Sequence, residues 1–375
     1  MSKKPKYERR EPPRAARGES PASTLMRMLS RPGIGSTAFI ADQYDHEVQG
    51  TSVTKPLHGR GRVNSDAGVL QPLPASKKGI VLSHGYAPWY SDVDTYAMAA
   101  ASIDLAVRNA ICAGASLEYL AILDNFCWSS SNTPERLYEL KRAAKACYDL
   151  AVAYGTPFIS GKDSMFNDFR GFTAKDEPIH IAAPPTLLIS AIGVVPDVSR
   201  SVSLDFKLPG DSVYLIGETN AELGASEYFS MLGYVGNRVP HVDAKKNLKA
   251  YRAFSRAIEQ GIVASALGVG RGGLGVALAR STIGGELGVV LDLRKLPGDA
   301  RKADEILFSE SQGRILASVA SRQREVFERV MQGIPLTRIG EVMEKPRVAM
   351  KLPRSDLGMS LGDLARAYRK PFQNW

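Results

Sequence analysis

Residues 156–165, Thr-Pro-Phe-Ile-Ser-Gly-Lys-Asp-Ser-Met, combine side chains that can bind a phosphate, its metal ion and a polar substrate. The first half predicts a short apolar strand, and the second half predicts a polar turn. Gly161 lets the backbone approach a ligand with no side chain in the way. Lys162, Asp163 and Ser164 then supply a cation, a carboxylate and a hydroxyl, which suits phosphate and metal. The alternative is an ordinary polar turn, because short motifs are weak evidence.

A second carboxylate follows another apolar segment. Residues 119–123 predict a buried strand that ends at Asp124. A carboxylate there is costly unless it meets a cation, a metal or a ligand, although it could also cap a loop. A helix that starts within Asn132–Glu135 and is closed by Gly155 leads to the next strand. A crossover of this length predicts neighbouring parallel strands, so we expect Asp124 and Lys162 to emerge side by side.

An Ala-rich helix is expected over residues 95–113, with Asp94 as its N-cap. Asn109 falls on the apolar stripe of this helix. Two interpretations remain open for Asn109, a satisfied core amide and a group that faces a ligand.

The composition indicates an ordinary soluble protein. With 375 residues, of which 44% are hydrophobic and 23% charged, the chain is long enough for two or three domains of about 150 residues each. No apolar run approaches the ~18 residues of a membrane span, and the N-terminus lacks an apolar signal core. Cys112, Cys127 and Cys147 have neither metal-site nor disulfide spacing. A cytoplasmic location without membrane contact is expected.

The net charge of +9 is partly concentrated in the first 20 residues, which hold seven Lys/Arg and three Glu. This segment has no interleaved aromatic residues and matches no nucleic-acid module. We expect a disordered basic tail and no nucleic-acid partner.

A second unit is expected to begin near Ser212, after a Pro- and Gly-bounded segment over residues 196–210. Its glycine cluster over residues 268–273 opens a helix but lacks the Lys-Ser/Thr pair of a P-loop. The order of predicted strands and helices favours the α+β class.

Five motifs together resemble one family. They are Tyr44–Gly50, Leu123–Trp128, Gly161–Met165, Pro184–Thr186 and Phe308–Gly313, in this order. Over about residues 24–373 the chain resembles the second half of the formylglycinamide ribonucleotide amidotransferases (phosphoribosylformylglycinamidine synthases), within the aminoimidazole ribonucleotide synthetase-like superfamily.

The resemblance implies a two-domain unit. It implies that an N-terminal domain over residues 56–196 contributes strands to a shared β-barrel, and that an α/β sandwich occupies residues 208–355. Residues 1–22 would be the basic tail, residues 23–55 a linker with a short helix, and residues 356–375 a C-terminal extension.

The implied reaction consumes ATP to activate the amide oxygen of the substrate as an iminophosphate, and ammonia from glutamine then gives the amidine. ATP and Mg²⁺ are the implied cofactors. The family's catalytic histidine lies in the first half, which this chain lacks, so the catalytic residue is unknown here. The implied partners are a first-half chain, a glutaminase and a small bridging subunit, and association of two copies is a further expectation.

By position in the family motifs, Asp124, Gly161 and Lys162 are the expected ATP-binding residues, and Ser164 is the expected substrate-binding residue. Lys162 stands where many short members carry a magnesium-binding asparagine. A charged lysine cannot ligate a metal but can contact phosphate. Asp163 is therefore the expected metal ligand, with Asp124 as the alternative.

The resemblance also implies an auxiliary nucleotide site in this half, which binds ADP in large members of the family. Leu105 replaces the usual glutamate four residues before Asn109. Arg271 replaces an acidic residue in the segment over residues 267–273. We therefore expect no tightly held magnesium–ADP at that site.

Two other functions remain open. The chain could be a self-contained homodimeric enzyme of the superfamily, such as an aminoimidazole ribonucleotide synthetase, a thiamine monophosphate kinase or a selenophosphate synthase. It could also be a non-catalytic structural subunit. The sequence does not distinguish a natural split subunit from a gene fragment.

Overall fold

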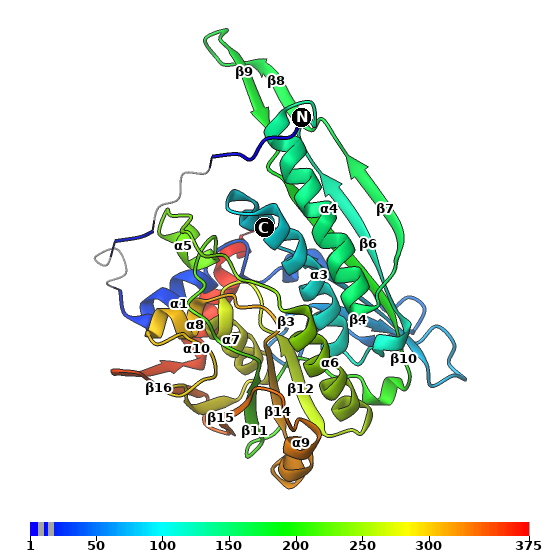
Figure 1. The fold of residues 1–375 in the computed structure, drawn as a ribbon. Coiled ribbons are helices and arrows are strands. Elements are labelled where there is room, and N and C mark those ends of the chain that lie inside the picture. Colours follow the sequence, from blue (N-terminus) through cyan, green and yellow to red (C-terminus); the bar gives the residue numbers. More distant parts are fainter. Residues whose placement is uncertain (7–10, 14–18, 375) are drawn as a thin grey trace.

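The structure, a computed structural model, describes residues 1–6, 11–13 and 19–374. Figure 1 shows two α+β units packed side by side, with a long hairpin that projects from the first unit. The expected α+β class and two-domain organisation are confirmed.

The first unit is built on a six-stranded sheet with the order β1-β4-β5-β10-β6-β7. Most neighbours in this sheet are antiparallel, but β6 and β7 are parallel. The strands are β1 (Ser52–Thr54), β4 (Ala67–Leu70), β5 (Gly79–Tyr86), β10 (Thr186–Val195), β6 (Leu120–Cys127) and β7 (Phe158–Ser164).

Two helices, α3 (Thr95–Cys112) and α4 (Pro134–Tyr154), cover one face of this sheet. The carboxylate of Asp94 accepts a hydrogen bond from the Tyr96 N–H at 2.9 Å, which confirms the expected N-cap of α3. The helix α4 ends at Gly155, whose φ of +70° is the left-handed conformation expected there. The opposite face of the sheet exposes Leu82 and Tyr86 to 48% and 41%.

The second unit contains a seven-stranded sheet with the order β12-β14-β11-β15-β13-β16-β17. The strands are β11 (Ser212–Ile216), β12 (Val263–Gly268), β13 (Gly288–Asp292), β14 (Ile315–Val319), β15 (Leu336–Met343), β16 (Arg347–Leu352) and β17 (Ser355–Ser360). The interior strand β11 is buried on both faces, so helices cover both sides of the sheet.

Tyr214 and its ring partner Phe327 lie on the side of this sheet that faces the first unit, whereas Leu215 lies in a second core on the other side. Helices α6 and α9 pack on the first side, and α1, α7, α8 and α10 pack on the second. The helices are α1 (Pro21–Leu29), α2 (Ala38–Ala41), α5 (Glu227–Met231), α6 (Ala244–Glu259), α7 (Gly273–Gly285), α8 (Ala303–Phe308), α9 (Arg324–Val330) and α10 (Leu361–Arg369).

The short helix expected in the linker over residues 23–55 is α1, which begins at Pro21 with Ser20 as its N-cap. Leu25, Met28 and Leu29 are fully buried in the core of the second unit. Tyr368 of α10 belongs to the same core. The linker helix and the C-terminal segment are therefore structural parts of the second unit.

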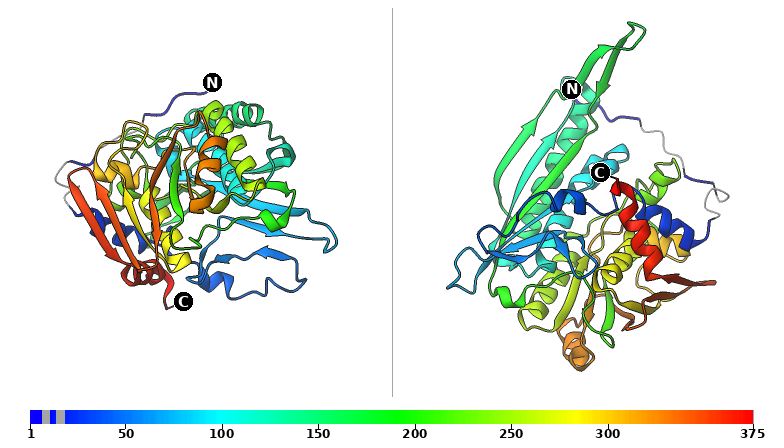
Figure 2. Two further views of the ribbon diagram at one scale, coloured as in Figure 1. Left: turned by 90° about the horizontal axis from the view of Figure 1, so that it is seen from below. Right: turned by 180° about the vertical axis from the view of Figure 1, so that it is seen from behind.

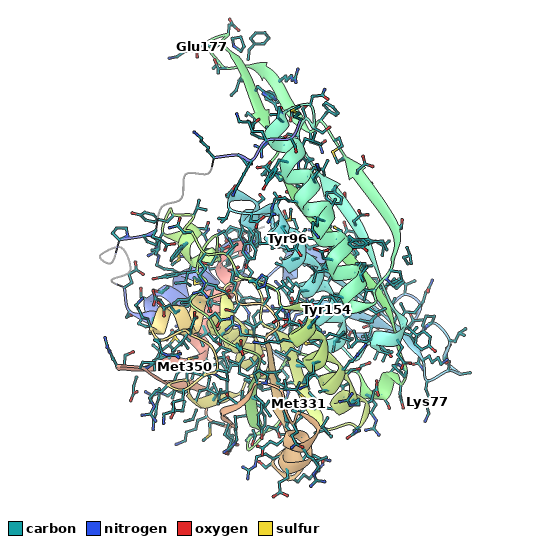
Figure 3. The ribbon with its side chains drawn as sticks, viewed as in Figure 1. Lys77, Tyr96, Tyr154, Glu177, Met331 and Met350 are labelled. Carbon is teal, nitrogen blue, oxygen red and sulfur yellow. The ribbon has the colours of Figure 1, made fainter. Side chains whose placement is uncertain are left out.

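Two small hairpins stand outside the main sheets. One consists of β2 (Leu57–His58) and β3 (Val63–Asn64), and the other of β8 (Asp168–Phe172) and β9 (Pro178–Ala182). The second hairpin projects far from the body, with Glu177 at its tip (Figure 3). Figure 2 shows the same projection from behind.

Part of the expected disordered tail, residues 7–10 and 14–18, lies outside the described residues. Within the tail, the Lys3 ammonium pairs with Glu135 at the start of α4, at 3.1 Å. In the part of the chain that the structure describes, no helix is long and apolar enough to cross a membrane.

Candidate functional site

The strands β6 and β7 bring the two predicted polar segments together. They are parallel neighbours, and Asp124 is paired with Gly161 while Asn125 is paired with Lys162. The expected juxtaposition of these two strands is therefore present. The helix α4 supplies the crossover between them.

Gly161 is required by the position of Asp124. A Cβ atom at residue 161 would lie 2.0 Å from Oδ1 of Asp124, far inside van der Waals contact. Gly161 has no positive φ, so its requirement is steric and not conformational. The bare backbone leaves room for the carboxylate beside the edge strand.

Asp124 and Asp163 lie on the face of the sheet that the helices cover. Asp163 is paired with Phe126, which is buried on that face. Burial raises the pKa of Asp124, the backbone N–H groups of Asp124 and Lys162 oppose this, and the charge of Asp163 raises the pKa further. The charge of Asp124 also contributes to the raised pKa of Cys147 on α4, which burial mainly causes.

Lys162 and Ser164 lie on the opposite, open face of the sheet. The Lys162 ammonium donates a hydrogen bond to the Ser164 hydroxyl at 2.7 Å, and side chains two residues apart in a strand share a face. The structure therefore places Asp124 on one face of the sheet and Lys162 with Ser164 on the other. The polar turn expected at Gly161 is wrong, because β7 continues to Ser164 and pairs with β6 along this length. Because successive side chains of a strand point to opposite faces, Asp163 lies on one face of the sheet and Lys162 and Ser164 lie on the other.

A cavity of about 390 Å³ lies between the two units and the linker. Its wall includes Leu105 and Asn109 of α3, Arg271 and Arg280 of the second unit, and Gly33 of the linker. The positions predicted to form an altered auxiliary nucleotide site are thus adjacent in the structure.

Asn109 combines features of both interpretations offered for it. Its Nδ2 donates a hydrogen bond to the carbonyl oxygen of His84 at 3.1 Å. Its Oδ1 has no hydrogen-bond partner among the described residues and faces Gly268 across the cavity wall. The side chain is buried and only partly satisfied.

The motif Phe308–Gly313 joins the two units. The buried carboxylate of Glu310 accepts hydrogen bonds from the Tyr90 hydroxyl at 2.7 Å and from the backbone N–H groups of Glu227 and Gly272 at 2.9 Å. Burial raises the pKa of Glu310, and these donors oppose that shift. The motif therefore stabilises the interface between the units.

A second buried network was not predicted. The carboxylate of Asp104 pairs with Arg108 one turn later on α3, and both side chains are fully buried. Asp104 also accepts hydrogen bonds from Tyr154 at 2.5 Å, Tyr251 at 2.7 Å and Asn247 at 2.8 Å. Figure 3 shows Tyr154 between the two units. A charged i,i+4 pair inside an apolar helix was the signal available in the sequence.

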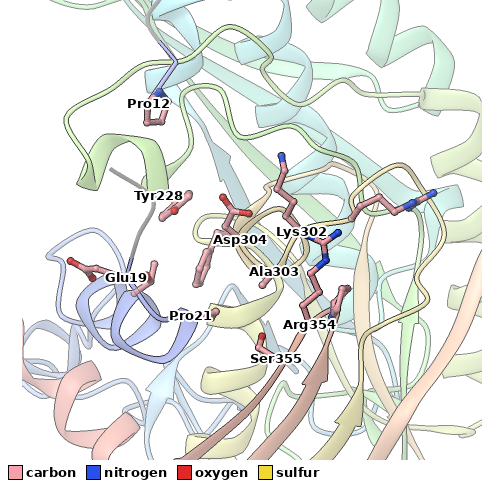
Figure 4. Close-up of a pocket in the computed structure, with 13 residues that line it drawn as sticks. Pro12, Glu19, Pro21, Tyr228, Lys302, Ala303, Asp304, Arg354 and Ser355 are labelled. Carbon is pink, nitrogen blue, oxygen red and sulfur yellow. The ribbon is translucent and has the colours of Figure 1, made fainter. Parts of the chain in front are cut away.

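Another cavity, of about 1010 Å³, lies in the second unit, and none of its lining residues belongs to β6 or β7. Tyr228, Lys302 and Arg354 lie along its wall (Figure 4). Among the described residues, no group of three or more His, Cys, Asp or Glu is arranged to hold a metal ion.

Comparison with known protein families gives two matches along the chain. The AIR synthase related protein N-terminal domain matches residues 64–195, and the AIR synthase related protein C-terminal domain matches residues 209–353. These ranges coincide with the two units of the structure.

Curated relatives include two proteins named phosphoribosylformylglycinamidine synthase subunit PurL. The one from Thermosynechococcus vestitus is 32% identical over 335 residues, which is 86% of this chain and 42% of the relative. The one from Methanocaldococcus jannaschii is 30% identical over 355 residues, which is 93% of this chain and 46% of the relative. The chain thus spans less than half the length of these relatives.

A solved structure of T. maritima PurL complexed with FGAR is similar in fold. Its TM-score is 0.70 at 18% sequence identity, and the match covers 94% of this chain and 55% of that chain. At this identity the likeness supports the fold.

Proposed function

The chain belongs to the AIR synthase related protein family, and we propose that it is the second synthetase unit of a phosphoribosylformylglycinamidine synthase. The pairing of Asp124 with Gly161 on neighbouring strands is the structural observation that supports this proposal most. The reaction would convert formylglycinamide ribonucleotide, ammonia and ATP to formylglycinamidine ribonucleotide, ADP and phosphate in purine synthesis.

In this reaction the carbonyl oxygen of the substrate's glycinamide group attacks the γ-phosphorus of ATP and ADP leaves. Ammonia then adds to the activated carbon, and phosphate leaves with that oxygen, so the formyl group is retained in the product. The protein must hold the phosphate and the amide in line and balance the developing charge. The polar groups of β6 and β7 offer a cation, carboxylates and a hydroxyl for this task.

We assign Asp124 and Asp163 to the side of the nucleotide that carries Mg²⁺. They share a face, and the charge of Asp163 raises the pKa of Asp124; two neighbouring carboxylates suit a divalent cation. Bound Mg²⁺ would spread the charge of the transferred phosphate. Gly161 leaves space for this contact at the edge strand.

We assign Lys162 and Ser164 to the open face of the same strand. The ammonium would contact a phosphate of ATP as a point charge, and the hydroxyl would contact the substrate. The strand β7 is the last strand of its sheet. A ligand can therefore reach both faces around its free edge.

The remaining parts of the enzyme belong to other chains in this proposal. A first-half synthetase chain would cover the open face of the first sheet, where Leu82 and Tyr86 are exposed, and would supply the catalytic histidine. A glutaminase and a small bridging subunit would supply ammonia. Burial raises the pKa of Cys112 and of Cys147 to about 12, so neither is suited to be the glutaminase nucleophile. We propose a cytoplasmic location for the complex, because its substrates are dissolved nucleotides.

The proposal is tested by assaying the purified chain alone and in a complex isolated from its host. With ammonium chloride as the nitrogen source, we expect phosphate release that depends on formylglycinamide ribonucleotide only in the complex. Turnover by the chain alone would instead indicate a self-contained enzyme. A complex with no nucleotide binding by this chain would indicate a structural subunit.

A further inference from the structure

The guanidinium of Arg271 is inserted beside the cavity between the units. Its Nε donates a hydrogen bond to Oε2 of Glu227 at 2.5 Å, and the Glu227 side chain is only 2% exposed. Arg31, from the linker, pairs with the other oxygen of the same carboxylate. Two guanidinium groups therefore neutralise one buried carboxylate, and one of them lines the cavity.

The same guanidinium contacts the first unit and the linker. Its carbon lies 3.8 Å from the ring centroid of Trp89, a cation–π contact, and Trp89 belongs to the 3₁₀ helix Pro88–Asp92. A Cβ atom at Gly33 would lie 2.4 Å from its Nη1, so the linker backbone packs directly against the guanidinium. One side chain thus contacts the linker, the first unit and the second unit.

The charges around the cavity do not fit a magnesium–nucleotide complex. Among the described residues that line the cavity, Asp66 is the only one with a carboxylate, and Arg280 binds both its oxygens at 3.0 Å. Leu105 offers no ligand atom, and Arg271 places a fixed positive charge beside the wall. A divalent cation would therefore meet a guanidinium and no free carboxylate.

We infer that Arg271 is a built-in cation that replaces a bound metal–nucleotide complex at this cavity and holds the linker, the 3₁₀ helix at Trp89 and the start of α7 in place. The cavity is consequently assembled without a ligand. This inference concerns a site separate from Asp124 and does not depend on the proposed reaction.

A double-mutant cycle on thermal unfolding tests the contact. Arg271→Ala leaves Glu227 with one partner, and we expect the Tm of the full chain to fall by about 5 °C. Gly33 has no positive φ, so alanine is conformationally allowed there. Gly33→Ala should therefore lower the Tm of the wild-type chain by about 3 °C. In the Arg271→Ala variant, which has no guanidinium at this place, the same substitution should lower the Tm by at most about 1 °C.

Two variants serve as controls. Gly68→Ala meets nothing within 4 Å, and Arg294→Ala breaks an exposed pair with Asp292, so both should leave the Tm nearly unchanged. Should Arg271→Ala not fold, Arg271→Lys keeps the charge but loses the planar stacking, and hydrogen exchange at residues 31–35 and 88–92 should be faster in that variant. Equal effects of Gly33→Ala in both backgrounds would overturn the inference.

Ligand binding gives an independent test with Mg²⁺–ADP as the probe. A ligand present at a hundred times its dissociation constant would raise the Tm by several degrees. In the Asp124→Ala variant, we expect that Mg²⁺–ADP does not raise the Tm. A rise that persists in Asp124→Ala and disappears in Asp66→Ala would place the nucleotide in the cavity and refute the inference. If Mg²⁺–ADP raises the Tm of the wild type but not of Asp124→Ala, the nucleotide binds at β6 and β7. This result would support the inferred role of Arg271 as the internal cation of the cavity.

Discussion

The carboxylate of Asp124 occupies the space that any side chain at position 161 would need. Gly161→Ala should therefore displace this carboxylate and lower the affinity of the assembled enzyme for ATP by about tenfold, an effect of about 1.4 kcal/mol. The dissociation constant for ATP, measured by calorimetry on the complex, checks this. The same substitution should have little further effect in Asp124→Ala, and independent, additive losses would argue against a shared ligand contact.

A substitution of Lys162 tests whether the open face of the same strand contacts ATP. If its ammonium contacts a phosphate, Lys162→Ala should raise the KM for ATP several-fold, and Lys162→Arg should restore part of the loss because it keeps the charge. Steady-state kinetics of the reconstituted enzyme give this value. An unchanged KM for ATP in Lys162→Ala would show that the assignment is mistaken.

The buried side chain of His58 should make the stability of the chain depend on pH. Burial lowers its pKa from 6.5 to about 4, against the opposing charges of Asp205 and Asp66 and with smaller effects of Lys207 and Arg280. Because the folded chain binds this proton less well than the unfolded chain, the stabilisation is complete above about pH 6.5 and is lost as the pH falls towards 4.

The variant His58→Gln keeps an acceptor for the Leu204 N–H but does not titrate in this range. Between pH 6.5 and pH 5, the wild type should lose about 2 kcal/mol of unfolding free energy relative to the variant. Urea unfolding of both chains at several pH values measures this difference. Parallel pH profiles would mean that His58 titrates normally in the folded chain.

At the level of elements, the sequence predicted which strands meet but not which way their side chains point. The helix predicted between Asn132 and Gly155 and the apolar segments around it were sufficient to predict that Asp124 and Lys162 lie on neighbouring parallel strands. The end of β7 was not predictable, because Gly161 to Ser164 are polar residues that resemble a turn. Pairing with β6 extends the strand and separates Asp163 from Ser164 onto opposite faces.

The helix α3 connects the two units through Asp104. Burial and the charge of Asp104 raise the pKa of Tyr154 and of Tyr251 well above their usual range, so both phenols remain donors. The sequence showed the charged pair of Asp104 and Arg108, but its partners lie more than 40 residues away and depend on tertiary packing.

Asp104→Asn should destabilise the chain by about 3 to 5 kcal/mol, because it leaves the buried Arg108 without a counter-ion. Denaturant unfolding followed by circular dichroism measures the change. Asp292→Asn, in an exposed pair, is the matched control and should be close to neutral. A small effect of Asp104→Asn would show that the network contributes little to the interface.

At the level of the whole molecule, the proposed function assigns the open face of the first sheet to a first-half chain. Leu82 and Tyr86 are exposed on this face. Replacing both residues by serine should abolish co-purification with a first-half chain while the Tm of the isolated chain stays nearly unchanged. Such a partner could not be identified from this sequence, because the residues that recognise the open face belong to the other chain.

The central claim is that β6 and β7 bind the ATP consumed in amidine synthesis. The most direct measurement is the kcat/KM for ATP of the complete complex, with ammonium chloride as nitrogen source, for the wild type, Asp124→Ala and the exposed control Asp292→Ala. We predict a loss of at least about tenfold in Asp124→Ala and wild-type values in the control. Wild-type kcat/KM in Asp124→Ala would contradict the claim.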